Sequence, residues 1–240
     1  MKPYSGAFSA LKNQPQRTVL FNFHRSSASW RVRILLNLKK IQFEYGAVNL
    51  LERENMGADF LAINPSGLVP ALWIDGNLLT ESMAIAEYLE ETRPENFPLL
   101  PKDSYQRAVV RRICEHVNAG IQPMQNLRLL DKISEDYKAD KAEWTAYWNK
   151  RGHDSLEEIL KDHAGIYCVG DNLSLADVFF YPQMYSGVQR FGVRKDDYVH
   201  LKRVFDNLLK LEEFRAADPE QQPDAQKKKV SDPQQNSPAN

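Results

Sequence analysis

Residues 21–36 read FNFHRSSASWRVRILL and join an expected strand to an expected helix. The segment 18–23 is rich in β-branched and aromatic residues, which favour a strand, and an apolar helical pattern begins at Trp30. Three serines, Ser26, Ser27 and Ser29, lie between them. The first N–H groups of a helix are unpaired donors at the positive end of its dipole, so they attract anions and lower the pKa of a nearby thiol. The turn therefore predicts a site for an anion or a thiolate.

This serine turn has two interpretations. It contains no cysteine, so a thiol that is activated there must come from a ligand. A free thiol titrates near ~8.5, and a modest lowering of that pKa gives much thiolate at neutral pH. Alternatively, one of the serines simply caps the helix by accepting a backbone N–H. The residues of this segment leave both interpretations open.

The composition is that of an ordinary soluble globular protein. The chain has 240 residues, of which 42% are hydrophobic and 26% charged, with a net charge of -1. This balance gives no indication of nucleic-acid binding, and no apolar run approaches the ~20 residues of a membrane span. No Asp or Glu precedes Glu44, whereas eight Lys or Arg residues do. We expect either a positive field near the first helix, which favours anionic ligands, or a solvated basic face.

The two cysteines, Cys114 and Cys168, lie in apolar contexts without CxxC or Cys/His metal spacing. They predict buried, inert thiols in a reducing compartment, and no bound metal. The N-terminal residues lack the apolar region of a secretory signal. Their lack of acids has a faint likeness to a mitochondrial presequence, which Pro3 and Pro15 weaken. We expect a cytoplasmic protein.

The hydrophobic pattern divides the chain into an α/β block and a helical block. Residues 17–94 read as strand, helix, strand, helix, strand, strand and helix, with Asp75-Gly76 as a tight hairpin turn. A βαβ unit followed by a hairpin and a helix is the thioredoxin-like arrangement. In that arrangement Val69-Pro70 precedes a strand and faces the serine turn, and we expect a cis peptide bond there.

The remaining segments differ in composition. Residues 103–215 carry helical apolar periodicity, interrupted at Pro123, and predict an all-helical domain. Ser174 and Asp177 form a capping-box pattern, so we expect Asp177 to be structural rather than catalytic. Three segments are expected to lack a packed fold: a flexible lead at 1–16, a linker at 95–102, and a disordered tail at 216–240 that is rich in Pro, Gln, Lys and Asp.

A thioredoxin-like block without CxxC, joined to a helical block, resembles the cytosolic glutathione transferases over residues 18–222. More narrowly, the chain resembles the zeta class, which includes the maleylacetoacetate isomerases. The segments that carry this resemblance are SSASWRVRI (26–34), NPSGLVPAL (64–72), ESMAIAEYLEETRP (81–94), IQPMQNL (121–127) and AGIYCVGDNLSLAD (164–177). The resemblance implies the two-domain glutathione transferase fold, glutathione as cofactor and a homodimer.

The resemblance also implies roles for the residues of the α/β block. Ser26 would donate a hydrogen bond to the glutathione sulfur and favour its anion, assisted by Ser27. Val69, which precedes Pro70, would pair its backbone with the cysteinyl part of the tripeptide as an added strand. At the γ-glutamyl end, Ser82 would bind the carboxylate and Glu81 the amine. The other glutathione-binding positions are Ala28, Asn55 at the glycyl part, and, from the helical domain, Asn126 and Gln122, the last across a dimer interface.

The chain departs from the zeta pattern at two positions. The family signature carries a cysteine where this chain has Ala28, which leaves the glutathione site intact but weakens the expectation of efficient isomerisation. The family counterpart of Arg128 is commonly small and polar, so this bulkier cation is expected to narrow the substrate pocket or change its charge. Arg190, placed on the loop after the Ser174 helix, matches a position proposed to hold a substrate carboxylate. Its alternative is an ordinary surface arginine.

The activity implied by the resemblance is the isomerisation of maleylacetoacetate to fumarylacetoacetate in phenylalanine and tyrosine breakdown. Glutathione thiolate would add to the cis double bond and leave after rotation. One alternative is a transferase acting on α-halo acids or other small electrophiles. Another is a glutathione-binding module without chemistry, which Ala28 favours. A thiol–disulfide oxidoreductase is disfavoured because no cysteine lies near Ser26. The expected partners are glutathione, a small electrophilic dicarboxylate and a second copy of the chain.

Overall fold

The computed structural model describes residues 2–4, 6 and 8–226, which form two compact units. Unit 1 comprises Met1–Ile85 together with Arg215–Asn240, and unit 2 comprises Ala86–Phe214. An α/β block followed by a helical block is therefore confirmed. The boundary differs from the expectation, because it lies within one helix, between Ile85 and Ala86, and not in the segment 95–102.

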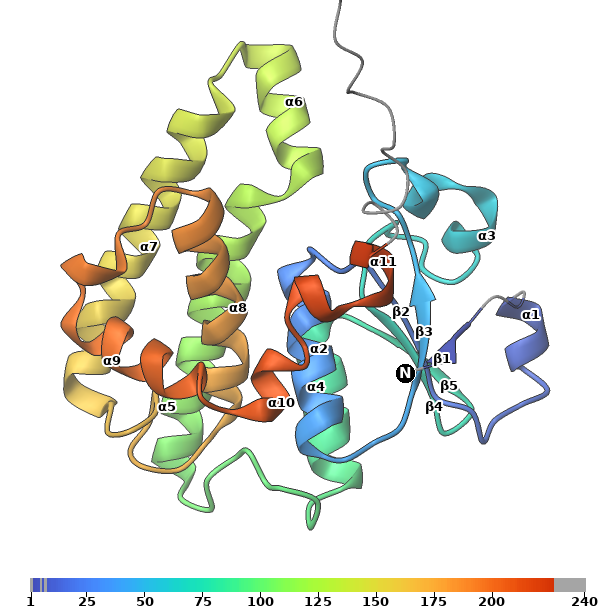
Figure 1. Cartoon of the computed structure of the whole chain (residues 1–240), viewed down its shortest axis with the longest axis horizontal. Helices are drawn as coiled ribbons and strands as arrows, with labels where there is room; N and C mark the ends of the chain where they lie inside the picture. Colours follow the sequence, from blue (N-terminus) through green and yellow to red (C-terminus); the bar gives the residue numbers. More distant parts are fainter. Residues whose placement is uncertain (1, 5, 7, 227–240) are drawn as a thin grey trace, which may run out of the picture. The chain divides into compact units, whose positions relative to one another are not determined.

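Unit 1 is built on a five-stranded mixed sheet of order β1-β3-β2-β4-β5 (Figure 1). Strands β1, β2 and β3 are parallel, and β4 and β5 are antiparallel to their neighbours. Helix α2 lies on one side of the sheet, and α1 and α3 lie on the other. The elements are β1 (Lys2–Pro3), α1 (Phe8–Leu11), β2 (Val19–Asn22), α2 (Ser27–Leu38), β3 (Glu44–Ala47), η1 (Glu54–Met56), α3 (Ala58–Leu61), β4 (Ala71–Ile74), β5 (Asn77–Thr80), α4 (Ser82–Thr92), η5 (Pro219–Gln221) and α11 (Pro223–Gln226).

The strand register brings three connecting segments to one end of this sheet. Phe21 of β2 pairs with Ala71 of β4, and Ala71 pairs with Thr80 of β5. The turn after β2, the peptide before β4 and the start of α4 after β5 therefore lie beside one another. The predicted cis peptide bond at Val69-Pro70 is confirmed. This sheet end is where the thioredoxin-like arrangement places the serine turn.

The N-terminal lead was expected to be flexible, and for its described residues that expectation is wrong. Strand β1 adds a parallel edge to the sheet beside β3. Leu11 of α1 is fully buried in a cluster with Val19, Phe21 and Trp73. An apolar side chain buried in this way stabilises a fold by about 2 kcal/mol, which holds the short helix against the sheet.

The expected disordered tail is also wrong, for residues 216–226. Ala217 and Gln222 are buried, and the Nε2 of Gln222 donates to the backbone oxygens of Ala216 at 3.0 Å and Asp218 at 2.8 Å. This segment is mostly polar, and these hydrogen bonds act together with the burial of the small apolar residues Ala217 and Pro219. The part of the expected tail at 227–240 lies outside the described residues.

Unit 2 is helical, as predicted. Its long helices bury Val110, Ile113, Leu156 and Phe179 completely. The predicted interruption at Pro123 is confirmed, because the chain leaves α5 through a π turn and a 3-10 turn. The elements are the rest of α4, α5 (Ser104–Glu115), η2 (His116–Ile121), η3 (Gln122–Gln125), α6 (Leu127–Tyr137), α7 (Lys141–His163), α8 (Leu175–Arg190), η4 (Lys195–Asp197), α9 (Val199–Leu208) and α10 (Glu212–Arg215).

The predicted capping box at the start of α8 is confirmed. The Asp177 carboxylate accepts hydrogen bonds from the N–H of Ser174 at 2.9 Å and from the N–H of Cys168 at 2.8 Å. Asp177 is fully buried among these donors, so its role is structural. Both cysteines, Cys114 and Cys168, are free and buried as expected, and burial raises the pKa of the Cys168 thiol.

A buried histidine in α7 makes the stability of unit 2 depend on pH. His153 is fully buried with its Nδ1 2.7 Å from the carbonyl oxygen of Asn149, and burial lowers its pKa from 6.5 to about 4. As the pH falls, the unfolded chain binds a proton at this histidine at a higher pH than the folded chain does. The stability of the fold is therefore at its full value above pH ~6.5 and decreases as the pH falls towards ~4. We expect the free energy of unfolding to fall by about 3 kcal/mol across that window.

Urea unfolding at a series of pH values measures this loss. His153→Gln should reduce the fall in the free energy of unfolding between pH ~6.5 and ~4, because glutamine binds no proton in either state. His163→Gln, at the last residue of the same helix, is the matched control and should keep the loss of stability at acid pH. If His153→Gln loses as much stability at acid pH as the wild type does, other groups cause that loss.

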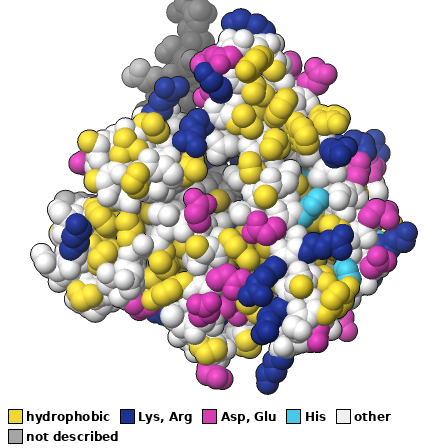
Figure 2. All heavy atoms as spheres, turned by 180° about the vertical axis from the view of Figure 1, so that it is seen from behind, with side chains coloured by type: hydrophobic (Ala, Val, Ile, Leu, Met, Phe, Trp, Pro, Cys, Tyr) yellow, Lys and Arg dark blue, Asp and Glu magenta, His cyan; other side chains and the backbone are white. Residues whose placement is uncertain are grey.

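The described residues contain no helix that is both long enough and apolar enough to cross a membrane. Figure 2 shows basic and acidic side chains interspersed on the face that it draws. Of the basic residues in α2, Arg31 and Arg33 are fully buried. These two arginines therefore do not belong to a solvated basic face. Their charges lie inside unit 1.

Candidate active site

Ser26 is the N-cap of α2, with φ -73° and ψ 116°. Its Oγ accepts the Ser29 N–H at 3.2 Å. A hydroxyl that accepts in this way still has its own O–H to donate, so capping and thiol binding are compatible. Ser27, the first residue of the helix, is buried, and Ala28 is half-buried. The capping interpretation of the serine turn is confirmed, and it leaves the thiol-binding interpretation open as a prediction.

A second helix N-terminus lies at the same sheet end. The Ser82 hydroxyl, at the first residue of α4, accepts a hydrogen bond from Nη1 of Arg31 at 3.0 Å. Both side chains are buried, and this bond joins α2 to the start of α4. Because the Ser82 oxygen accepts from Arg31, its O–H is free to point at a ligand. Two helix N-termini and a buried guanidinium give this end of the sheet positive potential.

Glu81 precedes Ser82 with φ 65°, in the left-handed region that non-glycine residues seldom adopt. Its carbonyl oxygen accepts the Ile85 N–H at 3.0 Å, so it lies where the N-cap of α4 belongs. Its side chain is exposed. Unusual backbone of this kind is found where a ligand or a tight turn requires it. The geometry leaves the Glu81 carboxylate accessible to a cation, such as an amine.

Asn55 and the cis peptide are linked through the loop that precedes β4. The Nδ2 of Asn55 donates to the Gly67 carbonyl oxygen at 2.7 Å. Gly67 has φ 65°, and a Cβ there would lie only 3.0 Å from the Met56 sulfur, so the loop requires glycine. Asn55 therefore shapes the loop that carries Val69-Pro70.

The turn before Ser26 is held by two charged side chains that sequence reasoning did not identify. Arg33, in α2, donates to the carbonyl oxygen of His24 at 2.9 Å and to that of Phe23 at 3.4 Å. Asp224, in α11, accepts the backbone N–H of His24 at 2.9 Å. Burial lowers the pKa of Arg33 to about 10, so it stays charged at neutral pH.

These two residues gave no usable signal in the sequence. Arg33 lies in a helix with few exposed positions. A single sequence does not distinguish such a helix from one with a buried face and an exposed face. Asp224 lies in a polar stretch that reads as a tail. Arg31 was noted only as one of several basic residues before Glu44.

The predicted site residues from the helical domain belong to unit 2, whereas the other predicted glutathione-binding residues belong to unit 1. Gln122 begins η3, and Asn126 is the N-cap of α6, where its Oδ1 accepts the Arg128 N–H at 3.0 Å. Arg128 is exposed. Arg190 was expected on a loop, but it is the exposed last residue of α8, with its guanidinium 5.1 Å from the Phe191 ring centre. The roles of these four residues in binding stay predictions.

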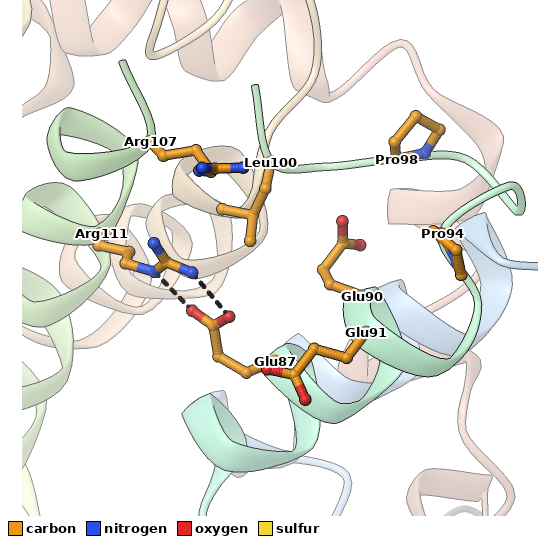
Figure 3. Close-up of a pocket in the computed structure, with 8 residues that line it drawn as sticks. All are labelled: Glu87, Glu90, Glu91, Pro94, Pro98, Leu100, Arg107 and Arg111. Atoms are coloured by element: carbon orange, nitrogen blue, oxygen red, sulfur yellow. Dashed lines mark hydrogen bonds and ion pairs between the residues drawn. The ribbon is translucent and has the colours of Figure 1, made fainter. Parts of the chain in front are cut away.

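A pocket in unit 2 contains none of the predicted site residues (Figure 3). It has a volume of ≈ 280 Å³ and lies between α4, α5 and the segment 95–102. Arg111 and Glu87 form a two-bonded ion pair across it, at 2.7 and 2.9 Å. The Glu90 carboxylate accepts the Leu99 N–H at 2.9 Å. The ion pair joins α4 to α5, and the Glu90–Leu99 bond holds the expected linker against α4. Among the described residues, no cluster of His, Cys, Asp and Glu could hold a metal ion.

Comparison with known proteins identifies the family of this chain. The family models described as Glutathione S-transferase, N-terminal domain and Glutathione S-transferase, C-terminal domain match residues 25–92 and 130–220. The maleylacetoacetate isomerase of Dictyostelium discoideum is 43% identical over 215 residues, 88% of this chain and 97% of the relative. The zeta-class glutathione S-transferase of Euphorbia esula is 41% identical over 215 residues, 89% of this chain and 94% of the relative.

A solved structure gives the same result. The maleylacetoacetate isomerase of Anaeromyxobacter dehalogenans, with dicarboxyethyl glutathione and citrate bound in its active site, is 43% identical, with a TM-score of 0.77. The match covers 87% of this chain and 94% of that one. The chain belongs to the glutathione S-transferase family. Within that family its similarity is to the zeta class and the maleylacetoacetate isomerases.

Proposed function

We propose that this chain is a glutathione-dependent isomerase that converts maleylacetoacetate to its trans isomer, fumarylacetoacetate. The observation that carries the proposal is the sheet end where the Ser26 hydroxyl, the Ser82 hydroxyl and two helix N-termini lie beside the cis Val69-Pro70 peptide. It is supported by relatives that are maleylacetoacetate isomerases, one of them with a dicarboxyethyl derivative of glutathione bound.

The residues of unit 1 fit the parts of glutathione. Ser82 and the first N–H groups of α4 suit its γ-glutamyl carboxylate, and the exposed Glu81 suits its amine. The backbone at Val69 suits the cysteinyl part as an added strand. Glutathione supplies the nucleophilic sulfur, which adds to the double bond and leaves after rotation about the resulting single bond.

The protein contributes orientation and electrostatic stabilisation to this reaction. The Ser26 O–H donates to the sulfur and, with the positive end of α2, favours the thiolate over the thiol. The substrate is a small dicarboxylate, for which Arg190 is the proposed anchor, with Arg128 adjusting the charge of the pocket. Gln122 and Asn126 complete the glutathione site, Gln122 from the second copy of a homodimer. We place the enzyme in the cytoplasm, whose reducing conditions suit its two free cysteines.

Turnover distinguishes this function from its alternatives. The purified chain with glutathione should isomerise maleylacetoacetate faster than it conjugates a panel of α-halo acids. Negligible isomerisation with rapid conjugation would indicate the general transferase. No turnover of either substrate, with an unshifted thiol pKa for bound glutathione, would indicate a binding module.

Replacing Ala28 by cysteine tests the departure from the zeta signature. Ala28 is half-buried in the first turn of α2, two residues after Ser26. Since Ser26 and the helix N-terminus already favour the thiolate, we expect Ala28→Cys to change isomerase kcat by less than about tenfold, or 1.4 kcal/mol. Steady-state kinetics measure this change. A much larger gain would show that the native chain is tuned for another reaction.

A further inference from the structure

The carboxylate of Asp224 reaches the serine turn from the other end of the chain. Its Oδ2 accepts the backbone N–H of His24 at 2.9 Å and lies 3.1 Å from the Nδ1 of the same residue. Its Oδ1 accepts the hydroxyl of Tyr45, in β3, at 2.6 Å. Three donors, from His24 and Tyr45, thus converge on one carboxylate. His24 lies two positions before Ser26 in the sequence, whereas Asp224 lies close to the C-terminal end of the described residues.

The backbone of this turn has left the sheet and needs other partners. Asn22 is the last residue of β2, and its carbonyl oxygen accepts the Val48 N–H. Beyond it, the His24 N–H is bound by Asp224 and the His24 carbonyl oxygen by Arg33. Since a partly buried peptide group without a partner costs about 1–3 kcal/mol, these two side chains fix the path of the turn.

This path determines where Ser26 lies. The Ser26 N–H donates to the Phe23 carbonyl oxygen at 3.0 Å, and the same oxygen is contacted by Arg33. The Ser26 hydroxyl then caps α2 through Ser29. A shift of the His24 peptide therefore moves the Ser26 hydroxyl relative to the helix end beside it.

The segment that carries Asp224 is itself held in place by hydrogen bonds. Nε of Arg33 donates to the Ala217 carbonyl oxygen at 3.0 Å, so the same guanidinium holds both the turn and the returning chain. Gln222 is buried and fixes the backbone just before Asp224. The buried cation of Arg33 also favours an anion at Asp224. Burial alone raises the pKa of Asp224, but hydrogen bonds from His24 and Tyr45 lower it below the usual value, so Asp224 is ionised at neutral pH.

We propose that Asp224 is a positioning residue for the proposed reaction: it fixes the His24 peptide and thereby holds the Ser26 hydroxyl where it stabilises the glutathione thiolate. This inference rests on the proposed function. In the proposed complex, Asp224 is not one of the residues assigned to the sulfur or to the rest of glutathione. Its loss should therefore change the ionisation of the bound thiol more than the affinity for the tripeptide.

The experiment compares three variants of the full chain with the wild type. Asp224→Ala removes all three contacts. Asp224→Asn keeps an oxygen that accepts the His24 N–H and is the conservative rescue. Glu220→Gln is the matched control, because it neutralises an exposed carboxylate of the same segment. For each, we measure the thiol pKa of bound glutathione by ultraviolet titration, its Kd by calorimetry, isomerase kcat, and hydrogen exchange of peptides covering residues 22–30.

In Asp224→Ala, we expect kcat to fall about tenfold to a hundredfold, as for a displaced catalytic group, with a raised thiol pKa and faster exchange in 22–30. The Kd for glutathione should change less than about threefold, within the usual context dependence of one contact. Asp224→Asn should recover most but not all of the loss, because its single acceptor oxygen cannot replace both carboxylate oxygens. Glu220→Gln should equal the wild type. If Asp224→Ala fails to fold, Asp224→Asn decides, because it should then show the same changes in smaller size.

Two results would overturn the inference. One is an Asp224→Ala protein that folds and keeps the wild-type thiol pKa and kcat. The other, if that protein does not fold, is an Asp224→Asn protein with wild-type thiol pKa, kcat and exchange. Failure of the proposed function is a separate result, because it is observed in the wild type as an unshifted thiol pKa and absent turnover. In that case hydrogen exchange still reports whether Asp224 fixes the turn.

Discussion

Replacing Ser26 by alanine should lower isomerase kcat by about 10²–10³-fold, the size expected when a preorganised donor to a developing or stabilised anion is removed. The Ser26 O–H is free to donate because its oxygen, not its proton, caps α2. Without it, the thiol of bound glutathione titrates higher and less thiolate is present at neutral pH. The Kd for glutathione should change little, since in the proposed complex the tripeptide is bound mainly at Val69, Glu81 and Ser82.

The same substitution also removes a helix cap, which costs about 1 kcal/mol of stability. Asp103→Ala separates the two effects. Asp103 caps α5 by accepting the Gln106 N–H at 2.8 Å, and it lies in unit 2 outside the proposed site. It should reduce stability by a similar amount and leave kcat unchanged. Ser26→Thr should keep most of the activity because it retains the hydroxyl. Equal losses of kcat in Ser26→Ala and Asp103→Ala would contradict a specific role for Ser26.

Replacing Ser82 by alanine should weaken glutathione binding and have little effect on kcat, the opposite of what we expect for Ser26→Ala. Its buried hydroxyl accepts from Arg31 and donates to the γ-glutamyl carboxylate in the proposed complex. A hydrogen bond to a charged group contributes about 1.5–3 kcal/mol, so the Kd for glutathione should rise about tenfold to a hundredfold. At saturating glutathione, kcat should fall far less than in Ser26→Ala, because the sulfur keeps its own donor.

Calorimetric titration of glutathione measures the effect of Ser82→Ala. Ser104→Ala is the matched control, since Ser104 is an exposed serine at the first residue of another helix, α5. Ser82→Thr should restore most of the affinity. An unchanged Kd in Ser82→Ala would mean that the γ-glutamyl carboxylate binds elsewhere.

Local patterns were sufficient to predict the α/β block and its site end. The serine turn, the Asp75-Gly76 hairpin and Val69-Pro70 are each determined by a few neighbouring residues, so one sequence reveals them. The capping box at Ser174 is of the same kind. The thioredoxin-like order also predicts that the cis peptide faces the serine turn. That the start of α4 lies beside them is shown by the strand register of the structure.

What the sequence did not predict depends on contacts between distant residues. Leu11 lies in a stretch that reads as a lead, and only the sheet beside it shows that the side chain is buried. Asp224 lies in a polar stretch whose order comes from Arg33, His24 and Tyr45, all far away in sequence. Composition predicts disorder for such a segment, because it buries little apolar area and its order depends on a few specific polar contacts.

Titration of glutathione bound to the wild-type chain tests the central claim most directly. Thiolate absorbance is followed against pH at saturating glutathione, with Ser26→Ala as the comparison. We expect the bound thiol to titrate below neutral pH in the wild type, well under the ~8.5 of a free thiol, and to move most of the way back in Ser26→Ala. A wild-type titration at the free value, or one that Ser26→Ala leaves unchanged, would contradict the claim that Ser26 activates the sulfur.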